Sequence, residues 1–348
     1  MSTAVLSAYG FKAAETEAVP FGSGLINHTW KLRHAGADYI LQRVNQNVFP
    51  YPDHIADNIR AVAGYLERHH PGYLFPAPLR TPDGRDLVQV EDEGYFRLFA
   101  FVPGAQARTV VEGPEPAFEA AAQFGQFTRL LSGFDVRRLQ PTLPHFHDLS
   151  LRFRQLVTAV ENSDGERLAE SRDEISYLVS LSALVRQFER LRTHNAFRLR
   201  VTHHDTKISN VLFDAAGKGL CVVDLDTVMP GYFFSDVGDM MRTYLSPVSE
   251  EEQDFDRIEV RDEVYQAIIA GYCSHMKDEL APEEKAHLFF SGKFMVFMQA
   301  LRFLTDHLNK DSYYGARYPG HNLVRARNQV TLLRRLIEKE RPLSAFRG

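Results

Sequence analysis

Cysteine is scarce in this sequence of 348 residues, and several common sequence signatures are missing from it. The two cysteines, Cys221 and Cys273, lie far apart, and no C-x-x-C pair occurs. This pattern excludes a disulfide-stapled scaffold and a cysteine zinc ribbon, and it is typical of a reducing cytoplasm. The chain contains neither G-x-x-x-x-G-K-[ST] nor G-x-S-x-G. A P-loop nucleotidase is therefore excluded, and a serine hydrolase is disfavoured.

Long apolar segments and a surplus of positive charge are also missing. The most apolar stretch, residues 287–304, contains Lys293 and Arg302, which a bilayer span of about 20 apolar residues does not tolerate cheaply. The 40 Lys and Arg residues face 45 Asp and Glu residues, for a net charge of −5. This balance argues against nucleic acid or a membrane as a partner, but a local site for a small anion stays possible. Because the N-terminus also lacks a signal-like basic and apolar pattern, we expect a cytoplasmic protein.

The first hundred residues are predicted to form strands and turns around a single helix. Residues 52–68 place Ile55, Ile59, Val62 and Leu66 three or four positions apart, which is one face of a helix. The turn at residues 34–37 predicts an antiparallel hairpin between its two flanking segments. The predicted strands cover residues 19–33, 38–44, 87–90 and 95–102.

Beyond Pro103-Gly104 the pattern changes to helices. Two short apolar segments, 211–214 and 220–225, flank the turn residues AAGKG and predict a hairpin within this helical region. The predicted helices cover residues 115–131, 172–192, 260–276, 282–308 and 322–338. The sequence thus predicts an α+β chain, with a strand-rich part at 1–102 and a helical part at 103–348.

The strongest chemical signal is a set of three polar residues around the predicted hairpin. Asp205 is followed five positions later by Asn210, and Asp224 ends the second apolar segment. In phosphoryl transfer, a carboxylate can orient an attacking hydroxyl and accept its proton, while an amide oxygen and a second carboxylate bind Mg²⁺. The hairpin would bring Asp224 back beside Asn210. The alternative is an ordinary polar turn, since Asp and Asn are common turn formers.

The spacing H-x-D-x-x-x-x-N, then a hairpin, then an acidic strand end, resembles the kinase-like superfamily of aminoglycoside phosphotransferases and choline kinases. Longer strings, running from about Phe21 to about Arg327, resemble its N-acetylhexosamine 1-kinase branch. His204 departs from the pattern, since many relatives have Gly or Asn there. The strings that carry the resemblance are VTHHDTKISNVLFD, CVVDLDTVMPG, YILQRVNQNVF and LRFLTDHLNKDSYYG.

This resemblance implies a protein-kinase-like fold, with a small antiparallel-sheet lobe and a larger, mainly helical lobe. Mg-ATP would lie between the lobes, with Asp205 as the catalytic residue and Asn210 and Asp224 as metal ligands. The turn Gly22-Ser23-Gly24 would cover the phosphates with its backbone N–H groups. Glycines in a hairpin turn do not by themselves require a ligand.

Other nucleotide contacts are predicted on the strands and the helix of the first lobe. Arg43 is the candidate for the cation that touches the α- and β-phosphates, and Asp57 on the following helix could pair with it. The strand that carries Phe99 and Phe101 resembles the hinge where backbone groups hold adenine. Each of these residues also has an ordinary structural interpretation, as a solvated charge or as core.

For the acceptor, the resemblance points to Arg302 and Tyr313, which contact the sugar in that branch, and to Ile26, Asp205 and Asp224. Arg302 and Asp306 lie four positions apart and could instead form an ion pair within a helix. Asp236 and Asp239 begin a predicted helix and are expected to be N-terminal caps.

The sequence therefore predicts an ATP-dependent small-molecule kinase that phosphorylates the anomeric hydroxyl of an N-acetylhexosamine, as a monomer or homodimer. Two alternatives remain open. The same residues could phosphorylate an aminoglycoside or a choline-like amino alcohol, although a cationic acceptor needs an acidic pocket. A nucleotide-binding pseudokinase with a regulatory role is the second, although pseudokinases typically lack a residue of the set formed by Asp205, Asn210 and Asp224.

Overall fold

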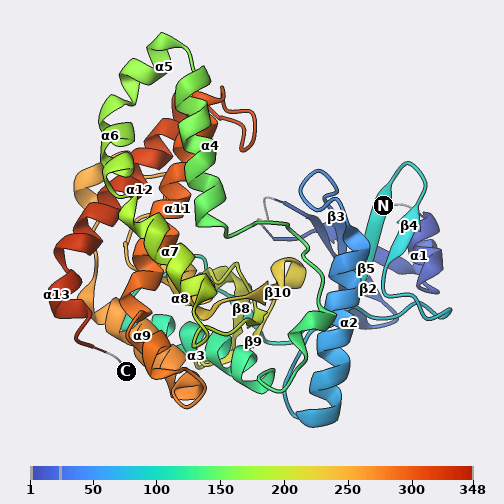
Figure 1. The fold of residues 1–348 in the computed structure, drawn as a ribbon. Helices are drawn as coiled ribbons and strands as arrows, with labels where there is room; N and C mark the ends of the chain where they lie inside the picture. The colour runs from blue at the N-terminus through green and yellow to red at the C-terminus, as the bar shows by residue number, and fades with distance from the viewer. Residues whose placement is uncertain (1–2, 23–25, 347–348) are drawn as a thin grey trace.

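The computed structural model describes residues 3–22 and 26–346. Its N-terminal part is a five-stranded antiparallel sheet with the strand order β1-β2-β3-β5-β4, and its C-terminal part is mainly helical. Figure 1 shows the sheet on one side and the long helices on the other, with β8, β9 and β10 between them. The strands of the sheet are β1 (Thr16–Pro20), β2 (His28–His34), β3 (Ala37–Val44), β4 (Val88–Val90) and β5 (Gly94–Ala100).

The register of this sheet decides which side chains face the helical part. Leu41 on β3 pairs with Leu98 on β5, and both belong to a small core that α1 (Thr3–Ala8) completes. Gln42 pairs with Arg97, so these two side chains lie on the opposite face, since directly paired residues share a face. Arg43 pairs with Phe96 and therefore lies on the same face as Leu41.

The helix α2 (Pro52–His69) lies beside the sheet but packs into the core of the helical part. Its apolar residues Ile55, Ile59, Val62 and Leu66 are buried in that larger core, as the three-to-four spacing predicts. Asn58 is buried on the same helix, and its amide donates to the carbonyls of Gln140 (2.7 Å) and Val228 (2.9 Å). Helix α2 therefore fastens the two parts of the molecule together.

The helical part is organised around α11, a 21-residue helix that packs against α4, α8 and α12. Its long apolar sequence is buried on nearly every side, as expected of a helix that is hydrophobic all round and lies inside a protein core. The helices are α3 (Pro114–Leu130), α4 (Leu149–Asn162), α5 (Gly165–Glu170), α6 (Arg172–Ser180), α7 (Ala183–Thr193), α8 (Phe233–Tyr244), α9 (Asp262–Met276), α10 (Pro282–Lys285), α11 (Leu288–Leu308), α12 (His321–Glu338) and α13 (Glu340–Leu343).

Two small sheets lie between the large sheet and these helices. The predicted hairpin forms β8 (Val211–Phe213) and β9 (Gly219–Val222), and β6 (Gln106–Ala107) adds a third strand. A second pair joins β7 (Arg200–Thr202) to β10 (Met229–Gly231). Of the described helices, none is both long enough and apolar enough to cross a bilayer.

Two predicted helices are each divided in the structure. The helix expected over 172–192 is two helices, α6 and α7. Buried residues on one helix face recur every three or four positions, but Leu178 and Leu184 are six positions apart and do not lie on one face of a continuous helix. The helix expected over 282–308 is divided into α10 and α11. Here the Glu284 carboxylate turns back to accept the backbone N–H of Ala281 and also pairs with Arg200.

The close approach of α3 and α9 gives a stability prediction. A Cβ on Gly271 would lie 2.3 Å from the backbone oxygen of Phe118, whereas one on Gly64 in α2 would meet nothing within 4 Å. We expect Gly271→Ala to lower the free energy of unfolding by about 1–3 kcal/mol. The matched control Gly64→Ala should raise it by about 0.5–1 kcal/mol, since alanine is the better helix former. Urea denaturation measures both, and equal effects would contradict the packing described here.

Candidate active site

Asp205 lies on the loop between β7 and β8, at the centre of a small hydrogen-bonded group. Lys207 Nζ donates to Asp205 Oδ2 at 2.8 Å, and Asn210 Nδ2 donates to the same oxygen at 2.9 Å. About 25 % of the Asp205 side chain is exposed, so the carboxylate can be reached by a small molecule. Burial alone would raise the pKa of Asp205, but the charge and hydrogen bond of Lys207, with His203 and Asn210, lower it.

The backbone of this loop is held by two buried carboxylates of α8. Asp236 accepts the N–H groups of His203 (3.0 Å) and His204 (2.7 Å), and Asp239 accepts that of Thr206 (2.8 Å). The prediction that both aspartates cap the helix is wrong. They lie in the first two turns but bind the neighbouring loop instead. Burial raises the pKa of Asp236 to about 7, although the two backbone N–H groups act in the other direction.

His204, the residue that departs from the family pattern, has φ +66°. Gly and Asn tolerate this left-handed conformation best, which explains why they suit the position. In this chain the imidazole Nδ1 lies 3.1 Å from the carbonyl oxygens of both Thr202 and Thr227, and these contacts hold the strained residue in place.

The β8–β9 hairpin brings Asp224 back to the catalytic loop, as predicted. The Val223 N–H donates to the Asn210 carbonyl at 2.8 Å, and the His203 Nε2 lies 2.9 Å from the Val223 carbonyl. Asp224 itself has φ +60° and is open to solvent. Loss of hydration beside the surrounding protein atoms, and then the like charge of the nearby Asp226, raise the pKa of Asp224 to about 6.

The oxygen chemistry at this point fits a divalent cation. Asn210 Nδ2 donates to both the backbone and the side chain of Asp205, so its amide oxygen is turned to the opposite side. Within residues 3–22 and 26–346, no group of three or more His, Cys, Asp or Glu side chains is placed to hold a metal ion. A cation here would therefore take one amide and one carboxylate from the protein and its other ligands from phosphates and water, as Mg²⁺ commonly does.

Asp226 is a buried carboxylate that connects the sheet to this loop. Its Oδ1 lies 2.5 Å from Arg97 of β5, and its Oδ2 accepts a hydrogen bond from Asn27 at 2.7 Å. Arg97 also donates to Gln42 of the neighbouring strand, at 2.8 and 3.1 Å. Both members of the ion pair are almost fully buried, so the pair fixes the loop after Asp224 against the sheet.

Arg43 and Asp57 do not take the positions predicted for them. Arg43 is exposed on the outer face of the sheet, because alternation along β3 directs Gln42, and not Arg43, toward the helical part. Asp57 is also exposed, and its nearest cationic partner is Arg60 on the same helix, at 3.8 Å. The register instead places Arg97, and also Lys31 of β2, on the inner face.

The predicted adenine region is aromatic and lies on that inner face. Phe99 packs near the Arg97 guanidinium, and the Lys31 ammonium lies 4.1 Å from the centre of the Phe101 ring. Phe21, at the end of β1, meets Phe101 edge to face. Gly22 follows with φ +79°, a turn conformation, while Ser23 and Gly24 lie outside the described residues.

Arg302 of α11, which the sequence predicts to contact the acceptor, lies among aromatic rings. Its guanidinium is 5.3 Å from the Phe146 ring centre and 3.5 Å from the Tyr313 hydroxyl, and Tyr313 is 70 % exposed. The possible ion pair with Asp306 does not form. Asp306 accepts the backbone N–H groups of Tyr313 (2.7 Å) and Tyr314 (2.9 Å) and so shapes the turn after α11.

Ile26 is exposed where the chain enters β2. Its carbonyl oxygen accepts a hydrogen bond from Asn45 at 3.2 Å, and the structure describes no contact of its side chain with the acceptor side.

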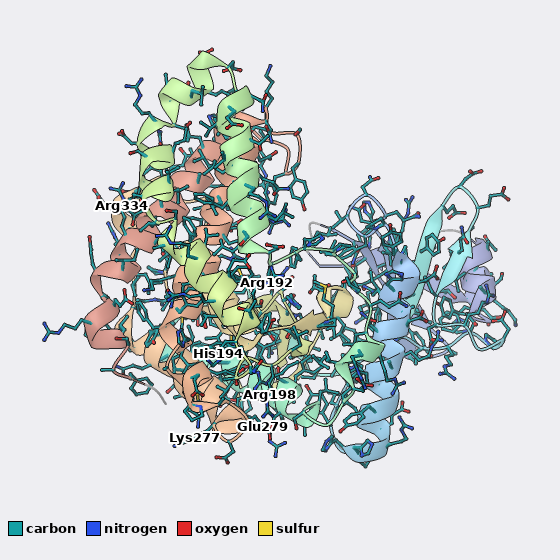
Figure 2. The ribbon with its side chains drawn as sticks, in the orientation of Figure 1. Arg192, His194, Arg198, Lys277, Glu279 and Arg334 are labelled. Carbon is teal, nitrogen blue, oxygen red and sulfur yellow. The ribbon has the colours of Figure 1, made fainter. Side chains whose placement is uncertain are left out.

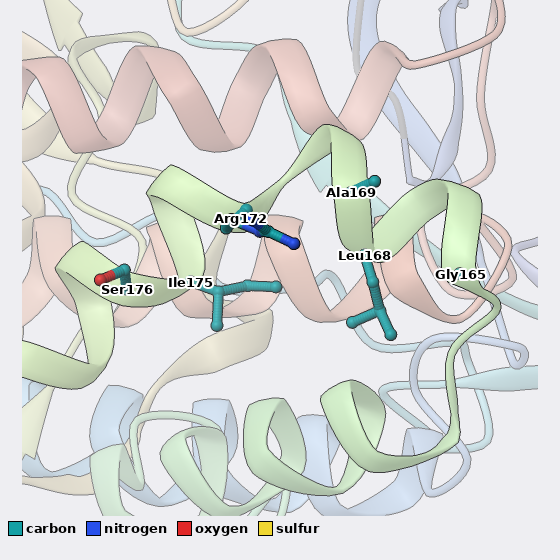
Figure 3. Close-up of a pocket in the computed structure, with 6 residues that line it drawn as sticks. All are labelled: Gly165, Leu168, Ala169, Arg172, Ile175 and Ser176. Atoms are coloured by element: carbon teal, nitrogen blue, oxygen red, sulfur yellow. The ribbon is translucent and has the colours of Figure 1, made fainter.

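Two hollows lie away from this site. One, of about 430 Å³, lies between α5 and α6 at the far end of the helical part (Figure 3). The other, of about 250 Å³, includes His194, which Figure 2 shows with Arg192 and Arg198 on the helical part. The first hollow is lined by Gly165, Leu168, Ala169, Arg172, Ile175 and Ser176.

Residues 17–283 match the phosphotransferase enzyme family. The chain belongs to this family. Its fold is also that of several solved structures. An aminoglycoside phosphotransferase from Alicyclobacillus acidocaldarius has a TM-score of 0.63 at 16% identity, with 99% of this chain and 97% of the other covered. A choline kinase from Cryptosporidium parvum has a TM-score of 0.58 at 15% identity, with 96% and 94% covered.

An amicoumacin kinase solved with AMP-PNP and Ca²⁺ is also similar, with a TM-score of 0.63 at 15% identity and 95% and 92% of the two chains covered. At these identities the likeness establishes the fold of this phosphotransferase. The α+β fold predicted from the sequence, with a small antiparallel sheet and a mainly helical remainder, is thereby confirmed.

His204 makes the stability of this phosphotransferase depend on pH. Burial lowers the pKa of its imidazole from 6.5 to about 4. Between pH 6.5 and about 4 the His204 imidazole is therefore protonated in the unfolded chain but neutral in the folded chain. The free energy of unfolding falls as the pH falls through this interval. We expect the difference in unfolding free energy between wild type and His204→Asn to change over this interval, by up to about 3 kcal/mol, in favour of the variant. A constant difference from pH 7 to pH 4 would contradict this.

The Arg97–Asp226 pair gives a second prediction, with Arg43 as the matched control on the same sheet. Arg97→Met leaves the Asp226 carboxylate buried without its cation, and we expect it to lower the free energy of unfolding by about 3–5 kcal/mol. Arg43→Met removes an exposed charge and should change it by less than about 0.5 kcal/mol. Denaturation and the KM for nucleotide should be measured for both. A nucleotide KM that rises only in Arg43→Met would restore the original prediction for that residue.

Proposed function

We propose that this phosphotransferase is an ATP-dependent kinase that transfers the γ-phosphoryl group to the anomeric hydroxyl of an N-acetylhexosamine. The observation that carries the proposal is the arrangement of Asp205, Asn210 and Asp224 on one loop and hairpin, together with Arg302, which lies among aromatic rings and has no carboxylate within ion-pairing distance among the described residues. The first part of this arrangement supports the reaction, and the second supports the class of acceptor.

In this proposal Asp205 orients the acceptor hydroxyl and takes its proton. Its lowered pKa keeps the carboxylate ionised at neutral pH, and Asn210 and Lys207 hold it in one orientation. Lys207 binds Asp205 and is attracted by the charge of Asp224, so its ammonium would help to neutralise the phosphoryl group in transfer. Lys207 stands two positions after Asp205 in the sequence, but no role for it was predicted from that spacing.

Nucleotide would bind between the sheet and the helical part, with Pro103-Gly104 joining the lobes 1–102 and 103–348. The turn at Gly22, Ser23 and Gly24 would cover the phosphates, and the aromatic inner face near Phe99 and Phe101 would hold the adenine. Asn210 and Asp224 would hold Mg²⁺, which when bound neutralises phosphate charge and fixes the orientation of the phosphates.

The charges around Arg302 support the proposed class of acceptor. The guanidinium of Arg302 lies among aromatic rings. The nearby carboxylate of Asp306 accepts hydrogen bonds from the backbone N–H groups of Tyr313 and Tyr314. A guanidinium donates hydrogen bonds to carbonyl and hydroxyl oxygens and repels an ammonium group. A neutral N-acetylated sugar therefore suits the region better than the amino alcohols or aminoglycosides named for the neighbouring structures.

The experiment is phosphate transfer from Mg-ATP to a panel of N-acetylhexosamines, amino alcohols and aminoglycosides, with NMR to locate the phosphate. We expect a 1-phosphate of an N-acetylhexosamine as the main product. We expect Asp205→Asn to lower kcat by about 10²–10⁴-fold while nucleotide still binds, because the variant keeps the side-chain shape but cannot accept the proton. Asp57→Asn is the matched control and should turn over like wild type.

Two outcomes would contradict the proposal. A product phosphorylated on an amino alcohol or aminoglycoside would overturn the acceptor class. Nucleotide binding without transfer to any compound would favour a pseudokinase.

A further inference from the structure

The segment 141–148 leads from the region beneath α2 to the start of α4 and passes the catalytic loop on the acceptor side. Figure 1 shows this green segment crossing between α2 and α4. It contains His145 and His147, which the function proposed above leaves without a role. His145 is largely exposed, but the Nδ1 atom of His147 is buried and has no hydrogen-bond partner among the described residues.

His147 lies between the catalytic loop and Arg302. Its ring is stacked on Phe146 with 4.4 Å between centroids, and it meets His204 edge to face at 5.1 Å. His204 directly precedes Asp205, and Phe146 lies 5.3 Å from the Arg302 guanidinium. The imidazole is therefore part of the wall that joins the two groups assigned to the acceptor.

The backbone that presents His147 is fixed on both sides. Arg152 of α4 donates to the carbonyls of His145 (3.1 Å) and Phe146 (3.2 Å), and Asp148 caps the helix by accepting the Leu151 N–H at 3.0 Å. An unpartnered polar atom in a rigid, buried position costs free energy unless a ligand completes it. Most buried polar atoms of native proteins have a hydrogen-bond partner, so the unpartnered Nδ1 of His147 calls for one from outside the chain.

We propose that His147 is an acceptor-binding residue, whose Nδ1 accepts a hydrogen bond from a hydroxyl or amide N–H group of the acceptor. This rests on the proposed function and names a specificity-determining contact for it. Arg302, on the other side of Phe146, donates to an oxygen of the same molecule. Together the two side chains require an acceptor molecule with a hydrogen-bond donor for His147 and, close to it, an oxygen atom for Arg302. An N-acylated or hydroxylated sugar carries both.

The charge around His147 supports this assignment. Burial, and then the neighbouring His204 and Arg302, hold the pKa of His147 well below its usual range, so the imidazole is neutral and keeps a lone pair. Among the described residues, neither Arg152 nor Arg302 has a carboxylate within ion-pairing distance. A region with two guanidinium groups that lack ion-pair partners and a neutral imidazole disfavours a cationic acceptor and favours one that offers oxygen atoms to the guanidinium groups.

The test compares three variants on whichever compound of the panel the wild type phosphorylates best. His147→Phe keeps the ring stacking but removes the nitrogen, and we expect the KM for that compound to rise about 10- to 100-fold, with the KM for ATP unchanged. His147→Asn places an amide where Nδ1 was and should recover part of the loss. His145→Ala is the matched control on the same segment and should behave as wild type.

Deoxy and deacetylated analogues identify the group that His147 contacts. For the analogue that lacks that group, wild type and His147→Phe should have the same KM. The proposal is overturned if His147→Phe, with an unchanged melting temperature, keeps the wild-type acceptor KM, or if the KM values for acceptor and ATP rise together in both His147 variants. If the best compound of the panel is an amine, the proposed function fails, while the His147 comparison still decides this inference on that compound.

Discussion

The site depends on one buried carboxylate. Asp236 accepts the consecutive backbone N–H groups of His203 and His204 and so fixes the direction in which the next residue, Asp205, leaves the loop. An unsatisfied buried backbone N–H is costly, so the Asp236 carboxylate stabilises this loop by accepting both donors. The strained φ of His204, the contact of Asp239 with Thr206, and the hydrogen bonds that hold Asp205 all follow from this anchor.

A second constraint holds the sheet and the helical part in one arrangement. The buried Arg97–Asp226 pair, with Asn27, ties the loop after Asp224 to the sheet, and Asn58 ties α2 to the neighbouring carbonyls of Gln140 and Val228. A buried ion pair is weak evidence for stability but specifies one arrangement of its elements. The two carboxylates of the sequence D-L-D therefore differ in their surroundings. Asp224 is open to solvent, whereas Asp226 is buried and binds Arg97 and Asn27.

Much of this could be predicted from the sequence, because local signals and tertiary structure agree there. The α2 periodicity, the turn before β3 and the β8–β9 hairpin each have a short-range physical cause, and the motif spacing placed Asp205, Asn210 and Asp224. The partners of Arg43, Asp57 and Arg302 could not be predicted in this way. Strand parity directs Arg43 outward, and Asp306 serves a turn that lies beyond its own helix. The alternation of side chains along a strand could have pointed to Arg97, because it is the one charged residue among the apolar residues of the strand GYFRLFA.

One loop and one hairpin hold Asp205, Asn210 and Asp224 together between the sheet and the helices, and we propose that nucleotide and metal bind there. A crystal structure with Mg²⁺ and a non-hydrolysable ATP analogue tests it most directly. We expect a metal ion bound by the Asn210 amide oxygen and the Asp224 carboxylate, the adenine against the inner face of the sheet near Phe101, and Asp205 facing the terminal phosphate. A nucleotide bound elsewhere, or a metal ion that touches neither Asn210 nor Asp224, would contradict it.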